Sequence, residues 1–321
     1  MASRKQTATI GRRELTLSNL DKVLWPKDRY TKGDLIRYYD SVAPWLLPHL
    51  KDRPLTLQRY PDGIDGPSFF EKQAPKFTPQ WVETVRISAP YKSKSSSTKI
   101  EYIVCNDEPT LVFCANLASI VLHVWYSRVE SVDSPDYALF DLDPFECTVK
   151  TLATVALELR NTLKQIGLEP LVKTSGGSGI HVVVPLKPVY TYDAIKQFGE
   201  IVARRVGDAR PKETTFERVI ARRPKGTVYL DYVQVGRGKT VVPPFSVRAR
   251  ERAPVSMPLD WSEVEGLARK RNPNPADEFA RWTMKNAVSR LKREGDLWAG
   301  KRWREARLEP AIKRAQKIWA I

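Results

Sequence analysis

The sequence has few cysteines and lacks a long apolar run. Cys105, Cys114 and Cys147 form no CxxC pair, and no histidine lies near them at the spacing of a metal site. We therefore expect buried, reduced thiols and not a disulfide framework or a zinc site. The chain contains no apolar stretch of about eighteen residues, and residues 1–15 carry no apolar signal core. These absences favour a cytoplasmic protein over a secreted or membrane protein.

Acidic residues are scarce relative to basic ones. The chain has 37 aspartates and glutamates against 53 lysines and arginines, which gives a formal net charge of +16. Such an excess is typical of a polyanion partner, either nucleic acid or an anionic membrane surface. Half of the excess lies in residues 281–321, where Trp282, Trp298, Trp303 and Trp319 alternate with the charges. Tryptophans spaced along helices are usually core anchors, so the charge alone favours nucleic acid.

The second half of the chain alternates clearly between strand and helix patterns. With 321 residues and 42% hydrophobic content, the chain can form a sizeable core. Its length is typical of roughly two domains, but the absence of a clear linker favours one catalytic unit with an N-terminal subdomain and C-terminal helices. The successive segments are a strand at YALFDLD, a helix at LATVALELRNTLKQIG, strands at LVKTS and IHVVVPL around a glycine turn, a helix at YDAIKQFGEIVARRVG and a strand at TVYLDYVQV. This mixture of hairpins and helices predicts the α+β class and not a doubly wound parallel sheet.

The first half begins with a polar, basic stretch. We expect residues 1–13 to form a flexible tail. Thr31 has the position of a helix N-cap with Asp34 three residues later, and the helix is expected to end near Pro44 and Pro48.

Later segments of the first half predict strands and one apolar helix. Leu55 to Tyr60 reads as a strand, and residues 88–99 form a polar loop between two further strands. Residues 111–127 are apolar nearly throughout, which predicts a buried helix.

Three aspartates form the first chemical pattern. In FDLDP, strand alternation directs Asp141 and Asp143 to one face, roughly 6–7 Å apart. Neighbouring carboxylates repel each other unless a cation screens them, although this motif alone is also typical of a solvated strand end. Asp231 lies within a run of β-forming residues, an expensive position for a charge. Three acids on two strands favour two-metal phosphoryl transfer, with a structural ion pair of Asp231 as the alternative.

A glycine-rich turn lies between these acids. The glycines of residues 175–179 suit a tight hairpin or a close approach to a ligand. Lys173, Ser175 and His181 flank the turn and make anion binding competitive with a purely structural hairpin. Four later cations suit a triphosphate or template phosphates, namely Arg237, Lys239, Arg248 and Arg250.

These motifs together resemble the polymerase domain of bacterial ligase D, in the archaeo-eukaryotic primase superfamily. FDLDP, TSGGSGIH, YLDYVQ and KTVVPPFSVRAR occur in the family's order, after LSNLDKVLWP, TKGDLIRYY, RPLTLQRYPDGIDGPSFFEKQ and LHVW. The resemblance covers about residues 14–295 and implies a primase-polymerase fold, with a mixed or antiparallel catalytic sheet flanked by helices. It implies an end-binding part at 14–135 and a metal and nucleotide sheet at 136–250. Residues 296–321 then form a basic C-terminal helical extension.

The resemblance also implies roles for individual residues. Asp141, Asp143 and Asp231 would be catalytic and hold two divalent metal ions, manganese or magnesium. Lys22 and Lys32 would hold the 5′-phosphate of a gapped or recessed DNA end. The implied nucleotide contacts are Ser175, Gly177, His181, His123, Gln234, Lys239, Arg248, Phe69 and Phe70. The loops at 88–99 and 217–226 resemble the family's end-bridging loops. Taken singly, His123 and the phenylalanines are typical of a core, and the two lysines are typical of solvated charges.

The implied activity is DNA-directed nucleotidyl transfer that fills in or extends DNA ends in non-homologous end joining, with a preference for ribonucleotides over deoxyribonucleotides. The chain lacks the KxDG motif of a ligase. We therefore expect a stand-alone, nucleoid-associated monomer that pairs across a DNA break and works with Ku and a separate ATP-dependent DNA ligase. Two alternatives remain. A primase in replication or damage tolerance would start synthesis without a primer. A non-catalytic DNA-end-bridging module is disfavoured by the three intact acids.

Overall fold

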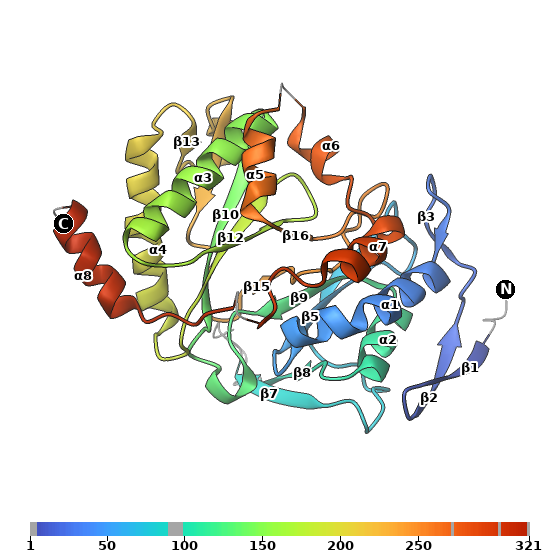
Figure 1. Cartoon of the computed structure of the whole chain (residues 1–321). Helices are drawn as coiled ribbons and strands as arrows, with labels where there is room; N and C mark the ends of the chain where they lie inside the picture. The colour runs from blue at the N-terminus through green and yellow to red at the C-terminus, as the bar shows by residue number, and fades with distance from the viewer. Residues whose placement is uncertain (1–4, 89–98, 271–272, 301–302, 320–321) are drawn as a thin grey trace. The chain divides into compact units, whose positions relative to one another are not determined.

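The computed structural model describes residues 5–88, 99–270, 273–300 and 303–319 (Figure 1). The chain forms two compact units, each assembled from three segments. The first unit comprises Met1–Glu130, Thr240–Ser256 and Trp282–Gly295, and the second comprises Ser131–Lys239, Met257–Arg281 and Asp296–Ile321. Residues 240–256, expected within the metal and nucleotide sheet, thus belong to the first unit.

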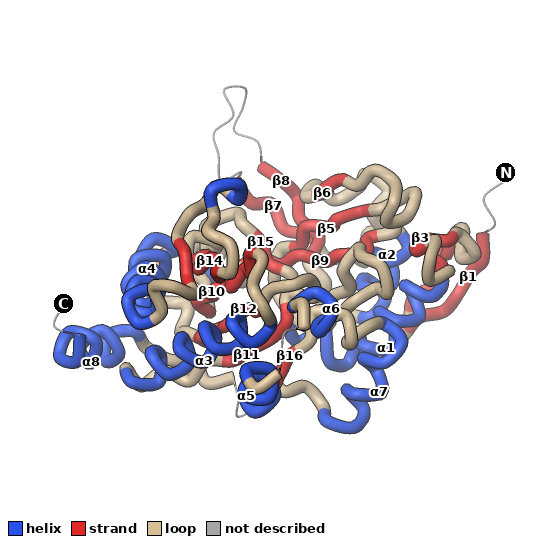
Figure 2. Tube along the Cα trace, turned by 90° about the horizontal axis from the view of Figure 1, so that it is seen from above, coloured by secondary structure: helices blue, strands red, loops and turns tan. Residues whose placement is uncertain are grey.

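The second unit is built on a six-stranded sheet of order β13-β14-β10-β12-β11-β16, whose central strands lie side by side in Figure 2. The strands are β10 (Tyr137–Phe145), β11 (Leu171–Thr174), β12 (Ile180–Pro185), β13 (Thr214–Thr215), β14 (Thr227–Asp231) and β16 (Pro258–Leu259). All neighbours are antiparallel except β13 and β14, which are parallel. This mixed sheet confirms the α+β prediction.

Two amphipathic helices pack on this sheet. Helix α3 (Val149–Gln165) follows the N-cap Thr148 and ends before Gly167, whose φ of 82° suits a glycine after a helix. Helix α4 (Tyr192–Ala209) places Gly199 against Phe140 of β10. Because side chains alternate along a strand, the face of β10 that carries Asp141 and Asp143 is opposite the face that packs under α4.

The second unit also contains three shorter helices and a 3₁₀ turn. They are α5 (Trp261–Ala268), α6 (Pro275–Phe279), α8 (Leu308–Trp319) and η2 (Ile220–Arg222). Trp298 is buried, and its indole Nε1 donates to the carbonyl oxygen of Val172 at 3.1 Å. The reading of this tryptophan as a core anchor is confirmed.

The first unit contains a four-stranded antiparallel sheet of order β15-β9-β5-β6. Its strands are β5 (Leu55–Arg59), β6 (Phe69–Glu71), β9 (Ser119–Trp125) and β15 (Thr240–Val241). Three hairpins join β1 (Lys5–Ile10) to β2 (Arg13–Ser18), β3 (Val23–Trp25) to β4 (Tyr30–Thr31), and β7 (Thr84–Ser88) to β8 (Lys99–Ile103). The helices are α1 (Lys32–Leu50), α2 (Glu108–Asn116) and α7 (Met284–Glu294), and the 3₁₀ turn η1 spans Val129–Ser131.

The bounds of α1 agree with the sequence prediction. Thr31 and Asp34 form a reciprocal capping box at the N-terminus. Pro44 and Pro48, expected near the end of the helix, lie inside its last turns, and the helix ends at Leu50. Burial of Leu46 and Leu50 holds the final turns against the loss of backbone hydrogen bonds at the prolines.

Two predictions for the first unit are wrong. Residues 5–10, expected in a flexible tail, form β1 and pair with β2, which buries Leu15 and Leu17 on one side. The apolar segment 111–127 is not one helix. It is α2 as far as Asn116 and then β9, and His123 therefore lies on a strand. Cys105 and Cys114 are buried as predicted, and Cys147 is half-buried. No helix in the described part of the chain is long and apolar enough to cross a bilayer.

Candidate active site

A row of polar side chains crosses the sheet of the second unit. In the strand register, Asp231 of β14 is directly opposite Asp141 of β10, Asp141 is opposite His181 of β12, and His181 is opposite Lys173 of β11. Directly opposed residues share a face of the sheet, and Asp143 joins that face two residues further along β10. The prediction that the Asp-x-Asp pair and the third acid come together is confirmed.

The three acids occupy a half-buried position on that face. Burial, together with the charge of Asp141, raises the pKa of Asp231 above its usual value, so the ionised form is disfavoured there. Lys239 and Arg218 act in the opposite direction, as does the bond from the backbone N–H of Val233 to the Asp231 carboxylate at 3.0 Å. Repulsion between Asp141 and Asp231 therefore remains partly uncompensated by the protein.

His181 and Lys173 extend the row beyond the acids. Nε2 of His181 lies 3.3 Å from Oδ1 of Asp141, and Nδ1 of His181 lies 2.9 Å from the Lys173 ammonium. Lys173 is only 1% exposed. The sequence placed Lys173 beside the glycine turn as an anion contact. In the structure it lies behind His181 and contacts the imidazole.

The glycine turn is organised by Ser175. Its hydroxyl oxygen accepts hydrogen bonds from the backbone N–H groups of Gly177 and Gly179, each at 3.1 Å. A side chain at Gly179 would place its Cβ 2.8 Å from the carbonyl oxygen of Leu142 and 3.5 Å from the Asp143 carboxylate. The turn therefore lies against the acidic strand, and only glycine permits that approach. The N–H of Gly177, expected to face a nucleotide, is directed to Ser175.

Strand β14 ends at Asp231, earlier than the sequence suggested, and Gln234 lies in the turn that follows. The ammonium of Lys239 folds back over this turn and donates to the carbonyl oxygen of Val233 at 2.6 Å. Lys239 also lines a cavity of about 460 Å³ that includes Arg218 and Arg237. The structure thus groups Lys239 and Gln234 with the acids in the second unit.

Other predicted nucleotide contacts lie in the first unit and form a cluster of their own. On one face of its sheet, the ring of Phe70 packs edge-on against His123, with centroids 5.3 Å apart. Nε2 of His123 lies 3.4 Å from the side-chain oxygen of Gln58. Burial, with a smaller contribution from the charge of Arg248, lowers the pKa of His123 to about 3, so the imidazole is neutral at physiological pH.

Phe69 and Phe70 contact different neighbours. Adjacent residues of a strand face opposite sides, and the Arg59 guanidinium lies over the Phe69 ring, 5.3 Å from its centroid. Phe70 is with His123 on the other face. The two phenylalanines, which the resemblance treats as a pair, therefore lie in different environments on opposite faces of β6.

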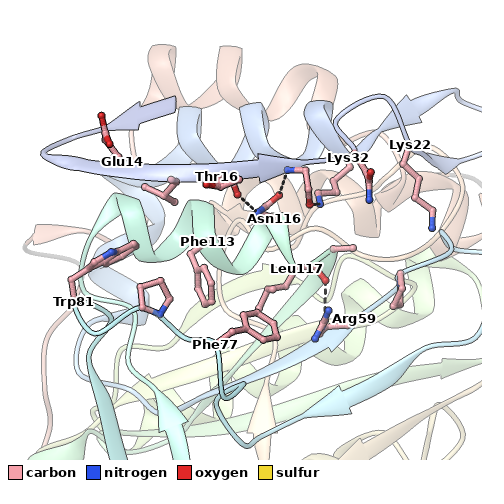
Figure 3. Close-up of a pocket in the computed structure, with 16 residues that line it drawn as sticks. Glu14, Thr16, Lys22, Lys32, Arg59, Phe77, Trp81, Phe113, Asn116 and Leu117 are labelled. Atoms are coloured by element: carbon pink, nitrogen blue, oxygen red, sulfur yellow. Dashed lines mark hydrogen bonds between the residues drawn. The ribbon is translucent and has the colours of Figure 1, made fainter. Parts of the chain in front are cut away.

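Lys22 and Lys32 meet in a pocket of about 680 Å³ in the first unit (Figure 3). Lys32 is 5% exposed, and its ammonium lies 3.2 Å from the Ser18 hydroxyl. Arg59 lines the same pocket, anchored to Leu117 O and to Glu71. Burial, then the charges of Arg59 and Lys22, lowers the pKa of Lys32 to about 8.

The charge around Lys32 is characteristic of an anion site. Within the described ranges, no ion pair joins Lys32 to an acidic side chain, whereas Lys22 pairs with Asp62 at 2.7 Å. A buried cation surrounded by other cations is stabilised when an anion binds.

The structure describes one of the two predicted end-bridging loops. The loop at 88–99 lies almost wholly outside the described residues. The loop at 217–226 carries η2, and the Arg223 guanidinium lies 4.0 Å from the centroid of the Tyr229 ring. In the part of the chain that the structure describes, no three histidine, cysteine or acidic side chains already converge as a complete metal cage.

The basic C-terminal stretch is partly committed to internal contacts. Arg290 is 4% exposed, pairs with Glu294 at 2.9 Å and lies over the Trp282 ring. Arg281 pairs with Glu278 at 3.0 Å.

Comparisons with known proteins agree with this arrangement. The family model described as "LigD, primase-polymerase domain" matches residues 31–298. Bifunctional non-homologous end joining protein LigD of Bacillus subtilis is 34% identical over 284 residues, covering 88% of this chain and 43% of its own length. Multifunctional non-homologous end joining protein LigD of Mycolicibacterium smegmatis is 33% identical over 287 residues, covering 88% of this chain and 35% of its own length.

A solved structure is similar over nearly its full length. The polymerase domain of Mycobacterium tuberculosis ligase D, in complex with DNA, superimposes with a TM-score of 0.78 at 30% identity, covering 88% of this chain and 96% of that one. The chain thus spans less than half the length of the curated relatives but nearly all of this domain. By sequence and by fold, the chain belongs to the LigD primase-polymerase domain family.

Proposed function

We propose that this chain is a DNA-directed nucleotidyltransferase that fills in or extends DNA ends in non-homologous end joining. The observation that carries the proposal is the row Asp231, Asp141, His181 and Lys173, with Asp143 on the same face of one sheet. Relatives named for end joining and a similar domain solved with DNA support it.

The acids fit a pair of divalent metal ions. Their oxygens are the ligands that magnesium and manganese prefer, and the raised pKa of Asp231 reflects a repulsion that bound cations would relieve. We assign Asp141, Asp143 and Asp231 as the residues that would hold the metals. When bound, the ions would activate the primer 3′-hydroxyl and neutralise the leaving pyrophosphate.

His181 is assigned to a phosphate of the incoming nucleotide. A lysine ammonium can only donate a hydrogen bond, so Lys173 would make Nδ1 of His181 an acceptor and leave the proton on Nε2. Nε2–H is then directed toward the acidic side of the row, where it lies 3.3 Å from Asp141. Ser175, Gln234 and Lys239 are assigned to the same nucleotide, which Gly177 would approach closely without donating its N–H, since that group is bonded to Ser175.

A preference for ribonucleotides is assigned to the cluster around His123. A neutral imidazole carries one donor and one acceptor, which suits a sugar hydroxyl in a site shielded from water. Phe70, Gln58 and Arg248 surround the ring and would fix its orientation.

The pocket of Lys22 and Lys32 is assigned to the 5′-phosphate of a gapped or 3′-overhang end. A terminal phosphate carries more negative charge than a phosphodiester, so a buried lysine that has no acidic partner among the described residues, Lys32, favours broken ends over continuous strands. The net charge of +16 supports wider contact with the DNA backbone. Ku and a separate ATP-dependent ligase are the partners we propose, with the protein acting as a monomer that pairs across a break.

The proposal is tested by primer extension on gapped DNA. The assay compares magnesium with manganese, ribonucleotides with deoxyribonucleotides, and a downstream 5′-phosphate with a 5′-hydroxyl. We expect metal-dependent extension that prefers ribonucleotides and the phosphorylated gap. Efficient synthesis without a primer, and indifference to the 5′-phosphate, would instead indicate a primase. Tight end binding without extension under any metal would indicate a bridging module.

A further inference from the structure

The pocket around Lys32 extends well beyond the basic cluster. Figure 3 shows Lys22, Lys32 and Arg59 toward one side of the pocket and an aromatic group toward the other, in which Phe77 lies nearest Arg59 and Phe113 and Trp81 lie farther away. Thr16 and Asn116 lie between the two ends, where the Asn116 amide donates to Thr16 O at 3.0 Å. A phosphate alone would occupy the basic end and leave the aromatic end unexplained.

The aromatic end has a buried floor and exposed walls. Phe113 is 7% exposed, and its ring packs edge-on against Trp81 with centroids 6.5 Å apart. Phe77 is 67% exposed, more than any other large hydrophobic side chain recorded in the described ranges. The Arg13 guanidinium lies over the Trp81 ring, 5.7 Å from its centroid. An exposed aromatic surface beside a cation is the usual platform on which nucleic-acid bases stack.

The two ends differ in charge. The basic end carries three cations, and Lys32 has no acidic partner there among the described residues. The acidic side chain that lines the pocket, Glu14, lies toward the aromatic end (Figure 3). A phosphate is therefore attracted most strongly to the basic end, because Glu14 and Arg13 offset each other at the aromatic end. This difference fixes the direction of any ligand that joins a phosphate to a flat ring.

We infer that the aromatic end binds the unpaired base of the 5′-terminal DNA nucleotide whose phosphate occupies the basic end. This inference rests on the proposed function and goes beyond it, because the pocket then recognises a whole terminal nucleotide and not a phosphate alone. Stacking on Phe77 and Trp81 accepts any base, since every base has a π-face. A base must leave its partner strand to enter the pocket, and this costs least at a mismatched or frayed end.

The pocket therefore favours 5′-phosphorylated ends whose last base pair is open. The aromatic walls stabilise the opened nucleotide, and the three cations hold its phosphate in place.

The experiment is an affinity titration of four gapped DNAs with the full chain. The downstream strand ends in a phosphorylated matched nucleotide, a phosphorylated mismatched nucleotide, a phosphorylated abasic residue, or a mismatched nucleotide with a 5′-hydroxyl. We expect the mismatched phosphorylated end to bind most tightly. Loss of its base should weaken binding by about five- to 150-fold, the effect of one base–aromatic stack.

Variants separate the base contact from the phosphate contact. Phe77→Ala should reduce the difference between mismatched and abasic ends, and it removes an exposed side chain that the core does not need. Ile201→Ala, at an exposed position of α4 outside this pocket, is the matched control and should bind all four DNAs as the wild type does.

Each outcome has one meaning. Equal affinity of the wild type for abasic and mismatched phosphorylated ends overturns the base site, even if phosphorylated ends still bind better than hydroxyl ends. Loss of the phosphate preference as well would remove the end-binding part of the proposed function. A base effect that Phe77→Ala leaves unchanged would place the base elsewhere and also overturn the inference.

Discussion

The preference for a 5′-phosphate should depend on pH because of Lys32. Its pKa is lowered to about 8 by burial and by the charges of Arg59 and Lys22. From that value, the side chain is roughly nine-tenths charged at pH 7 and one-tenth charged at pH 9. A terminal phosphate has its second pKa near 6, so its own charge is nearly constant over this range.

The expected magnitude follows from the contact that is lost. A charge-assisted hydrogen bond contributes about 1.5–3 kcal/mol, or roughly tenfold or more in affinity. The ratio of affinities for phosphate and hydroxyl ends should therefore be at least about tenfold at pH 7 and fall toward a few-fold at pH 9.5. Lys22→Ala combined with Lys32→Ala should erase the ratio at both pH values.

The free energy of unfolding should rise with pH, in the direction opposite to the preference for a 5′-phosphate. The unfolded chain binds the Lys32 proton more tightly than the folded chain does, because the folded pKa is the lower one. Lys32 therefore lowers the free energy of unfolding most below pH 8, and this destabilisation becomes smaller as the pH rises toward 10.5. Lys32→Met should thus raise the unfolding temperature at pH 7 while it weakens binding of the phosphorylated end.

The assay is a fluorescence-anisotropy titration of phosphorylated and hydroxyl gapped DNA between pH 7 and pH 9.5. Lys27→Ala is the matched control, because Lys27 is an exposed lysine paired with Glu251 outside the pocket. A phosphate preference that stays constant to pH 9.5, or survives in Lys32→Met, would refute the assignment of Lys32.

Three further predictions concern the acids, the glycine turn and the basic surface. Asp231→Asn should abolish primer extension and leave DNA affinity nearly unchanged. Because it removes a disfavoured charge, it should raise the metal-free unfolding temperature at neutral pH and reduce the stabilisation of the protein by manganese. Primer extension at the wild-type rate would contradict the metal assignment. Gly179→Ala should lower primer extension sharply, because its Cβ would clash with the carbonyl oxygen of Leu142. The control Gly266→Ala lies in α5, where a Cβ meets open space, and should raise the free energy of unfolding by about 0.5–1 kcal/mol in thermal unfolding. DNA affinity should fall steeply with salt as counterions are released, and a flat dependence between 50 and 200 mM would argue against phosphate contacts.

The sequence predicted that the three aspartates come together on one face of a sheet, for a physical reason. Strand alternation fixes the side to which Asp141 and Asp143 point, and a charge as costly as Asp231 within a β-forming run must serve a purpose. The register that aligns Asp231 with Asp141 depends on strand pairing across 90 residues of chain, which no local pattern encodes.

The apolar segment of residues 111–127 was wrongly predicted as one helix because its pattern of apolar residues has no periodicity. A run that is buried on all sides looks alike as helix and strand, so only length and residue type can separate them. The turn at Ala118, with φ of 56°, divides the segment. Ile120, Val121 and Val124 are β-branched and were the available signal for a strand.

The roles of Lys173 and Phe69 also lay beyond the sequence. Lys173 sits next to a glycine turn, which suggested an exposed cation, yet its neighbours across the sheet bury it behind His181. Phe69 and Phe70 are adjacent, and β6 had not been predicted as a strand, so their division between two faces was not expected.

The interleaving of the two units has a consequence for synthesis on the ribosome. The sheet of the first unit is completed by β15, residues 240–241, and Trp25 is held by a hydrogen bond to the carbonyl oxygen of Arg250 at 3.0 Å. Helix α7 packs on α1 and ends at Glu294. The N-terminal 130 residues must therefore wait, incomplete, while the whole sheet of the second unit emerges. Neither unit can be produced as one continuous fragment, and a chain stalled before residue 295 would expose an unfinished core to chaperones and proteases.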